Sequence, residues 1–364
     1  MKILNPIIRG IVGLLFIFSG LIKINDPMGT AIKLEEYFEV FSVDFTPFFH
    51  SLVPMALGFA VFLSVLEVVL GIAVLINYKM RITTSVLLVL IVFFTFLTFY
   101  SAYFNKVTDC GCFGDALKLT PWQSFTKDII LLVLITILFI NRNKYKAAFN
   151  PLVGHIMIAT VLIFQTGLAI YAIEHLPYID FRSYKVGANI PHLMQPSEPY
   201  KYQYVMEKDG KEVTLDAYPT EEGYEFKEMI LTNPEAQPKI TDYNVWADDG
   251  DYTTQTFEGI KLVIIINDVK KANKKNIPQI NKLISGTENT NITPIVLTAS
   301  DETSFENFRH EVQLATPFYF ADGTVLKTIS RSNPGLLLLQ NGIVKGKWHY
   351  NDVPEITEIK RLTE

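Results

Sequence analysis

Five long apolar runs before Tyr178 constrain the fold of this 364-residue chain more than any other feature. Each run is bounded by charge, proline or glycine, and approaches the ~20 residues that a helix needs to cross ~30 Å of hydrocarbon. The rest of the chain is polar enough to fold in water, so we expect a protein that is part membrane and part soluble. The runs cover residues 6–24, 55–78, 82–104, 125–140 and 152–173.

Lysine and arginine are concentrated at the N-terminus and in two of the connecting loops, which predicts that these segments face the cytoplasm. Five crossings then place everything after Tyr178 on the outer side. We therefore expect a protein of the bacterial cytoplasmic (inner) membrane, with a cytoplasmic N-terminus and a periplasmic or otherwise extracytoplasmic C-terminal domain. The basic loop residues are Lys79, Arg81, Arg142, Lys144 and Lys146.

Both cysteines of the chain, Cys110 and Cys112, lie in the segment TDCGCFGD in the second outer loop. The predicted topology puts them on the oxidising side of the membrane, where a disulfide can persist. A disulfide between residues two apart requires a sharp bend at Gly111, and such a strained bond is readily reduced. This favours exchange with a partner protein or with a membrane electron carrier such as a quinone.

Three structural explanations of the cysteine pair stay open. The pair is alternatively a permanently oxidised staple, a reduced pair kept for packing, or half of a metal site shared with another chain. Metal binding is the weakest of these, because two thiolates without a nearby histidine leave a four-ligand shell incomplete.

The segment TPWQ after the cysteines predicts a capped helix start, with Thr120 as the cap and Gln123 reaching back to it.

Glu67 lies in the middle of the second apolar run, where an ionisable side chain is costly unless it has a partner or a function. Arg9 is nearest in predicted depth, so we expect a structural ion pair between the first two membrane helices rather than a proton-transfer site.

Amphipathic spacing in residues 30–41 predicts a helix at the outer interface or a packed loop helix.

Further charged residues flank the predicted cysteine loop. Lys23 and Asp26 lie at the outer end of the first helix, and Lys127 and Asp128 near the start of the fourth. With Asp109, these side chains are expected to approach the cysteines, where a lysine lowers a thiol pKa and a carboxylate raises it. They are alternatively interfacial anchors.

The C-terminal half reads as β-rich and then as alternating strands and helices. A hairpin is predicted at residues 200–218 around the turn KDGK. Beyond residue 239 we expect a hairpin around Asp249 and Gly250, then the order βαβα followed by a second hairpin, an α/β layer domain. Its second helix is expected to open at Thr303, with Glu306 three residues on.

The N-terminal part resembles the DoxX and MauE group of small membrane proteins. FIFSGLIKINDP, the helix SVLEVVLGIAVL around Glu67, and DCGCFGD carry the resemblance, over residues 1–145. It implies a four-helix bundle, to which this chain adds a fifth transmembrane helix. It also implies a link to redox chemistry in the cell envelope, including the maturation of disulfide-rich partners.

The last domain resembles thioredoxin-like proteins of the envelope-anchored TlpA type, through ADDGDYTTQTFEG and SNPGLLLLQNGIV. The resemblance implies that Pro334 is a cis proline and that Asn333 and Pro334 belong to a partner-binding surface. The cysteines of a redox thioredoxin are missing, because NDVKKANKKN occupies the position of the CxxC motif. This domain is therefore expected to bind a partner without exchanging disulfides.

We thus expect a membrane helical bundle joined to an extracytoplasmic thioredoxin-like domain. The predicted function is an accessory role in thiol–disulfide chemistry through Cys110 and Cys112. The expected partners are an extracytoplasmic protein and the membrane lipid around the bundle. A quinone is the candidate cofactor. The alternative is a non-enzymatic membrane scaffold. No basic cluster indicates nucleic acid. The expected segments are residues 1–150 (bundle), 151–178 (fifth helix), 179–238 (β-rich connection) and 239–364 (thioredoxin-like domain).

Overall fold

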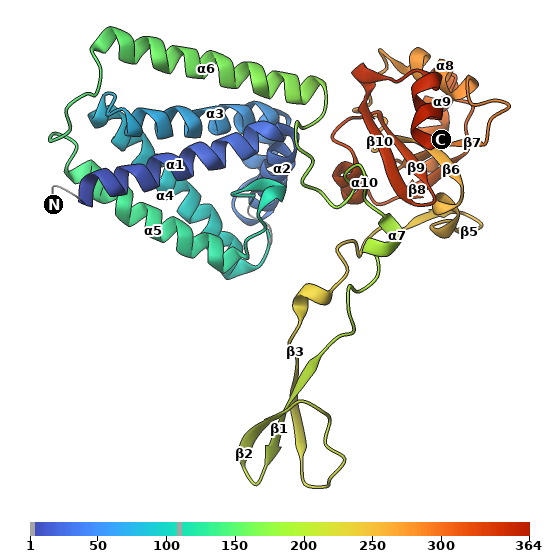
Figure 1. Ribbon diagram of the computed structural model, residues 1–364, viewed down its shortest axis with the longest axis horizontal. Coiled ribbons are helices and arrows are strands. Elements are labelled where there is room, and N and C mark those ends of the chain that lie inside the picture. The colour runs from blue at the N-terminus through green and yellow to red at the C-terminus, as the bar shows by residue number, and fades with distance from the viewer. Residues whose placement is uncertain (1–3, 108–110) are drawn as a thin grey trace. The chain divides into compact units, whose positions relative to one another are not determined.

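The computed structural model describes residues 4–107 and 111–364 of the chain (Figure 1). The chain divides into two compact units, Met1–Phe181 and Arg182–Glu364. The first unit is built of helices, and the second contains all the strands of the described chain. This division separates the apolar helices from the α/β part of the protein.

Five helices of the first unit are long and apolar enough to cross a membrane, which confirms the five predicted spans. The second span begins as a 3₁₀ helix, η1 (Pro47–Met55), and continues into α3. The five helices are α1 (Leu4–Asn25), α3 (Ala56–Leu75), α4 (Met80–Phe104), α5 (Pro121–Ile140) and α6 (Pro151–Glu174).

Helices α1 and α3 approach one another closely because glycines line their contact. A Cβ atom added at Gly20 would lie 2.7 Å from the Ser64 carbonyl oxygen, and one at Gly71 would lie 2.7 Å from the Gly13 carbonyl oxygen. Small residues let the backbones of membrane helices pack at short distance, where van der Waals contacts drive association. The pair is antiparallel, so the C-terminal part of α1 lies beside the middle of α3.

Helices α1, α3, α4 and α5 share one core, and α6 packs outside it. The shared core includes Phe16, Val74, Ile91 and Ile135, one from each of the four helices. Ala169 of α6 joins a separate cluster against α1 and α3. The four-helix core with an added fifth helix is thus observed as predicted.

Helix α2 (Pro27–Asp44) covers the end of this core at which α1 ends and α3 begins, and it contains the helical segment predicted at residues 30–41. Its Tyr37 and Phe41 are buried, and the Tyr37 hydroxyl lies 2.7 Å from the Ser101 hydroxyl on α4. The predicted start of α5 is also confirmed, since Thr120 and Gln123 form a capping box. That cap fixes where the cysteine loop ends.

The second unit contains a seven-stranded sheet in the order β10-β9-β6-β7-β8-β4-β5. Strands β6, β7 and β8 are parallel, and the outer strands are antiparallel. Apolar cores lie on both faces of this thioredoxin-like α/β sheet. The strands are β4 (Val245–Ala247), β5 (Gly250–Asp251), β6 (Ile260–Ile266), β7 (Ile292–Thr298), β8 (Phe318–Ala321), β9 (Gly335–Gln340) and β10 (Ile343–His349).

Five helices accompany this sheet, and the sequence prediction missed three of them. Helices α7, α10 and α11 and strand β8 were not predicted, because these elements of four to eight residues carry too little periodicity to be recognised. The expected helix start at Thr303 is wrong, because Asp301 caps the helix by accepting from the Ser304 amide. The helices are α7 (Ile190–Leu193), α8 (Ile277–Ser285), α9 (Glu302–Glu311), α10 (Gly323–Ile329) and α11 (Ile356–Thr363).

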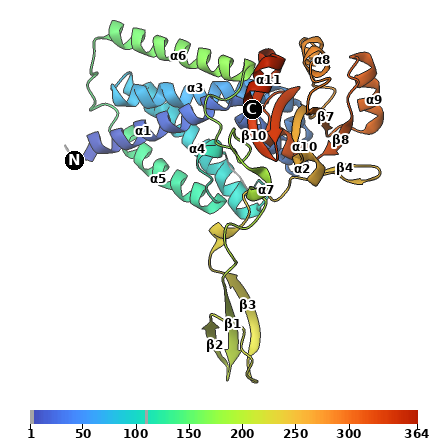
Figure 2. The same ribbon diagram turned by 45° about the vertical axis from the view of Figure 1, so that its right-hand side comes forward.

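A separate three-stranded antiparallel sheet, in the order β2-β1-β3, belongs to the same unit (Figure 2). Strands β1 (Tyr202–Lys208) and β2 (Lys211–Leu215) form the predicted hairpin. Asp209 and Gly210 make its turn with positive φ angles of 52° and 73°. Strand β3 (Glu225–Leu231) was not predicted, because its pairing with β1 follows a nine-residue connection without a hairpin signal.

Candidate functional site

The loop that carries Cys112 lies against α1, α2 and α5, at the end of the bundle where α4 ends and α5 begins. Ser19 on α1 donates a hydrogen bond of 2.9 Å to the Cys112 carbonyl oxygen. The Phe113 ring lies 5.6 Å from the Phe18 ring and 5.4 Å from the Lys127 ammonium. Gly111 adopts a φ of +62°, the sharp bend expected there. Cys110 and Asp109 lie outside the described residues.

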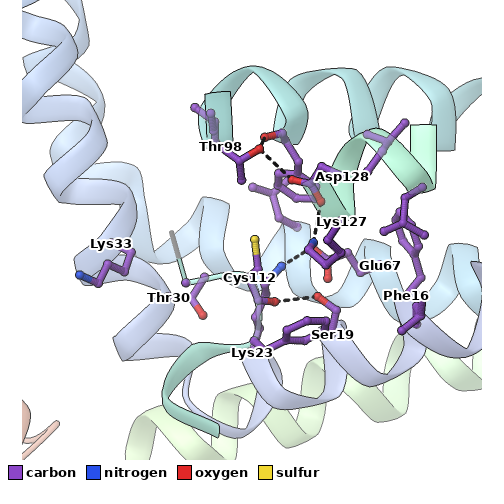
Figure 3. Close-up of a pocket in the computed structure, with 18 of the residues that line it drawn as sticks. Phe16, Ser19, Lys23, Thr30, Lys33, Glu67, Thr98, Cys112, Lys127 and Asp128 are labelled. Carbon is purple, nitrogen blue, oxygen red and sulfur yellow. Dashed lines mark hydrogen bonds and ion pairs between the residues drawn. The ribbon is translucent and has the colours of Figure 1, made fainter. Parts of the chain in front are cut away.

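A cavity of about 80 Å³ opens beneath this loop, between α1, α2, α3, α4 and α5. Figure 3 shows the Cys112 side chain pointing into the same space as Lys127 and Glu67. A volume of this size has room for several water molecules, since one needs roughly 10–15 Å³. The apolar part of the lining consists of Leu15, Phe16, Leu34, Leu63, Ile91, Phe94, Leu97, Phe113 and Leu131.

Two ion pairs lie in the wall of this mainly apolar cavity, in addition to Lys33. The Lys23 ammonium lies 2.6 Å from Glu67 Oε1, and both residues are buried. Lys127 lies 2.5 Å from Asp128 Oδ1, and Thr98 on α4 donates to Asp128 Oδ2 at 3.0 Å. Charges within a membrane bundle persist when they are paired, so each carboxylate is compensated by an adjacent ammonium.

Glu67 keeps one oxygen directed away from its lysine. Oε2 is buried and finds no hydrogen-bond donor among residues 4–107 and 111–364. An unsatisfied carboxylate oxygen in an apolar interior costs free energy, and the cavity beside it has room for water, which can donate to it. The cavity therefore offers an acceptor at one wall and the Cys112 side chain at another.

The predicted pairing of Glu67 with Arg9 is wrong. Arg9 donates to the Asn77 side chain at the opposite end of the bundle, while Lys23 pairs with Glu67. The antiparallel register of α1 and α3 sets Arg9 beside Asn77, ten residues beyond Glu67 and so about 15 Å away along the helix. An ion pair does join these two helices as predicted, but it is formed by a lysine instead.

The other predicted site residues are distributed as follows. Lys23, Lys127 and Asp128 line the cavity together with Cys112. Asp26 lies outside the lining, and its carboxylate caps α2 by accepting from the Gly29 amide at 2.9 Å. A capping role was readable from the sequence, because Asp26 directly precedes Pro27 at the start of α2.

Some polar contributors to the site were not predicted from the sequence. They include Ser19, Thr30, Lys33 and Thr98, which all line the cavity. Ser19 and Thr98 lie within apolar runs, where hydroxyls usually bond to their own helix backbone, so the sequence carried no sign that they serve the loop and Asp128. Lys33 contributes because α2 folds over the bundle, so that a Cβ atom added at Gly111 would lie 3.3 Å from the Lys33 side chain.

The predicted partner-binding residues are engaged within the second unit. The Asn333–Pro334 bond is cis, as the resemblance implied, and Pro334 is buried. The Asn333 side-chain amide donates to the Asp268 carbonyl at 2.8 Å, and the Asn333 carbonyl accepts from the Asn273 amide at 2.9 Å. The segment from Asp268 to Asn273 is thus tied to the proline loop.

Among the described residues, no group of three or more histidine, cysteine, aspartate or glutamate side chains could hold a metal ion.

Comparison with known proteins gives a relationship for the helical part. Residues 1–141 match the family described as methylamine utilisation protein MauE. These residues form a MauE-like membrane domain. The match agrees closely with the extent of the resemblance seen in the sequence.

The chain is also similar to a named protein over part of its length. The chain is 30% identical over 162 residues to Protein TlpB of Flavobacterium psychrophilum. The aligned residues cover 43% of this chain and 42% of that protein, so the chain spans about two fifths of the relative's length.

Proposed function

We propose that this membrane protein takes part in thiol–disulfide chemistry outside the cytoplasm, with Cys110 and Cys112 as the reacting pair. The bundle of residues 1–150 and the helix of residues 151–178 hold the pair in the membrane. Residues 179–238 and 239–364 form the β-rich connection and the thioredoxin-like domain, and face the periplasm, where they bind the partner protein.

The observation that carries this proposal is the position of Cys112. Its side chain points into a cavity with two ion pairs, at the end of a MauE-like membrane domain (Figure 3). A cysteine kept only as packing or as a loop staple needs no such polar environment. The chain has two cysteines, both in the segment 108–115, so the thioredoxin-like domain has none for exchange.

The proposed step is ordinary thiol–disulfide exchange. The thiolate of Cys110 attacks a disulfide sulfur of the partner, which forms a mixed disulfide and releases one partner thiolate. Cys112 then attacks the Cys110 sulfur, which forms the Cys110–Cys112 disulfide and releases the second partner thiolate. The partner gains the two electrons that the cysteine pair loses, and the same steps in reverse oxidise a partner.

A quinone, the expected candidate for an electron carrier, does not fit the cavity as it stands. The cavity has a volume of about 80 Å³, which is small beside the ~150 Å³ of a protein cavity that holds benzene. Glu67 Oε2 lacks a donor among the described residues, and the carbonyls of an oxidised quinone could not supply one, although a reduced quinol could. No step is therefore assigned to a carrier inside the cavity.

Thiol trapping in cells tests the exchange directly. With Cys112→Ser, the mixed disulfide between Cys110 and the partner cannot be resolved, and should appear as a heavier band that a reductant removes. Cys110→Ser should report whether Cys112 also attacks, and the double variant should give no band. If neither single variant yields a mixed disulfide with the protein present at normal amount, the proposal is wrong.

A scaffold function is the second candidate, because the β-rich connection exposes large apolar side chains such as Tyr218 and Phe226. In this case the cysteines are only a staple. The double cysteine-to-serine variant should then keep its cellular function, while deletion of residues 179–364 abolishes it. The redox proposal predicts that both changes abolish function, so the double variant separates the two.

A further inference from the structure

Glu67 is a buried ionisable side chain to which the proposed exchange gives no role. The residue is 1% exposed, and its Oε1 pairs with the Lys23 ammonium at 2.6 Å. Oε2 finds no hydrogen-bond donor among residues 4–107 and 111–364. An unpaired carboxylate oxygen inside a membrane bundle costs free energy, so it indicates that a donor binds beside it.

Cys112 and Glu67 line the same cavity of about 80 Å³ (Figure 3). A cavity of this volume has room for more than one water molecule, since each needs roughly 10–15 Å³. Water in this cavity can donate to the Glu67 carboxylate and accept from the Cys112 thiol. It thereby provides a path for a proton between the two side chains.

The other carboxylate of the cavity is occupied more fully. Asp128 Oδ1 pairs with Lys127 at 2.5 Å, and Oδ2 accepts a hydrogen bond of 3.0 Å from Thr98. Each oxygen of Asp128 therefore has a donor, whereas Glu67 has one oxygen without any among the described residues. This difference favours Glu67 as the group that takes up a proton.

Ionisable side chains reach the cavity around Glu67 from α1, α2, α5 and the cysteine loop, while α4 contributes Thr98 and apolar side chains. Each ammonium in the lining has a carboxylate partner, since Lys33 pairs with Glu36 at 3.1 Å in addition to the two pairs above. The ionisable side chains that line the cavity with Glu67 are Lys23, Lys33, Tyr37, Cys112, Lys127 and Asp128.

This pairing decides where the proton of a reacting thiol goes at the lowest cost. If the Cys112 proton left for bulk water, the thiolate would be an extra charge in a mainly apolar cavity whose ammonium groups are already paired. If the proton passes to Glu67, the negative charge only moves from oxygen to sulfur. The Lys23 ammonium then loses its carboxylate partner and becomes the counter-ion of the thiolate.

We infer that Glu67 accepts the proton of the Cys112 thiol through cavity water when Cys112 attacks the mixed disulfide. The S–H bond breaks, its electron pair stays on sulfur, and an O–H bond forms at Glu67. The thiolate bonds to the Cys110 sulfur, the bond from Cys110 to the partner breaks, and the partner leaves as a thiolate. The proton then passes from Glu67 through the water to that thiolate. The inference rests on the proposed exchange and adds a residue to it.

The pH dependence of Cys112 alkylation tests this role in the purified full-length protein with Cys110→Ser. A thiolate beside protonated Glu67 carries as many protons as a thiol beside the carboxylate, so its share does not change with pH. The thiolate is the form that reacts with a maleimide. Below the ordinary thiol range near pH ~8.5, the rate should therefore level off instead of falling about tenfold per pH unit.

Three variants identify the acceptor in this background. Glu67→Gln should turn the level part of the profile into a fall of about tenfold per pH unit. Lys23→Met combined with Glu67→Met should do the same, and it leaves no buried lysine unpaired that could disturb folding. Asp44→Asn is the matched control, because Asp44 pairs with Lys106 outside the cavity lining, and it should keep the level part.

A rate that falls about tenfold per pH unit throughout with Glu67 intact would overturn the inference. A level part that persists in Glu67→Gln would do so as well, and its disappearance in Asp128→Asn would then assign the acceptor to Asp128. The measurement needs no partner protein. A mixed disulfide trapped in cells together with a profile that falls throughout would refute the role of Glu67 alone, whereas a level profile without any mixed disulfide would refute the exchange instead.

Discussion

The Lys23 ammonium on α1 lies 2.6 Å from the Glu67 carboxylate on α3, and this buried ion pair faces the cavity that receives the Cys112 side chain. The pair links the two most closely packed helices of the bundle. It also leaves one carboxylate oxygen directed away from the lysine. One contact thus fixes both the helix packing and the polarity beneath the cysteine loop.

Removal of one partner of this ion pair should destabilise the bundle strongly. Lys23→Met leaves the Glu67 charge buried without compensation, which costs roughly 3–5 kcal/mol. The double change Lys23→Met and Glu67→Met removes both charges and should unfold close to the wild type. Denaturant unfolding in detergent measures the free energies. Lys33→Met, in a part-exposed pair with Glu36, is the control and should cost under about 1 kcal/mol.

Gly71→Ala should force α1 and α3 apart. The added methyl group would lie 2.7 Å from the Gly13 carbonyl oxygen, and such overpacking typically costs ~1–3 kcal/mol. Gly58→Ala on the same helix is the matched control, because nothing in the described chain lies within 4 Å of its Cβ position. Equal melting temperatures of the two variants would contradict the close glycine contact.

Thr120→Ala should loosen the end of the cysteine loop. It removes a capping box at the start of α5, and loss of such a cap costs about 1 kcal/mol. Thr126→Ala is the control, since the Thr126 hydroxyl bonds to the Trp122 carbonyl of its own helix. Hydrogen exchange of residues 117–123 should rise in the first variant and stay constant in the second.

Ser19→Ala should expose Cys112 to reagents. The Ser19 hydroxyl holds the Cys112 carbonyl at 2.9 Å, and a hydrogen bond of this type contributes ~0.5–1.5 kcal/mol. In a Cys110→Ser background, alkylation of Cys112 by a maleimide should be severalfold faster. Ser85→Ala, where the hydroxyl bonds to the Arg81 carbonyl, should leave the rate unchanged.

The second unit should lose stability in acid partly through Asp301. The Ser304 hydroxyl and amide hold the pKa of the Asp301 carboxyl below its usual value. A carboxyl with a lowered folded pKa stabilises the folded state above its unfolded pKa of about 3.9, and this contribution is lost as the pH falls through the folded value.

Asp301→Asn keeps a capping side chain but removes its titration. The variant should therefore unfold at a similar denaturant concentration to the wild type at neutral pH, and lose less stability below about pH 4. Fluorescence of Trp348, which lies in the same unit on β10, follows the unfolding. Identical acid profiles would show that the cap does not contribute.

The long elements of this protein were readable from local sequence. An apolar run of ~20 residues in a membrane leaves the backbone no alternative to a helix, so five spans followed from composition alone. The cap at Thr120 and the hairpin turn at Asp209 and Gly210 were equally local, because capping and turn chemistry act over a few residues. The order of the long strands and helices followed from alternating periodicity.

Partners in space were decided by the tertiary structure. Depth counted along two apolar runs suggested Arg9 for Glu67, but the register that the glycines of α1 and α3 impose brought Lys23 there instead. The same packing placed Ser19 and Thr98 in the cavity. Sequence therefore determined which segments cross the membrane and which residues are chemically able to act. The helix register decided which of these residues come into contact, because contacts between distant segments depend on packing that no local pattern records.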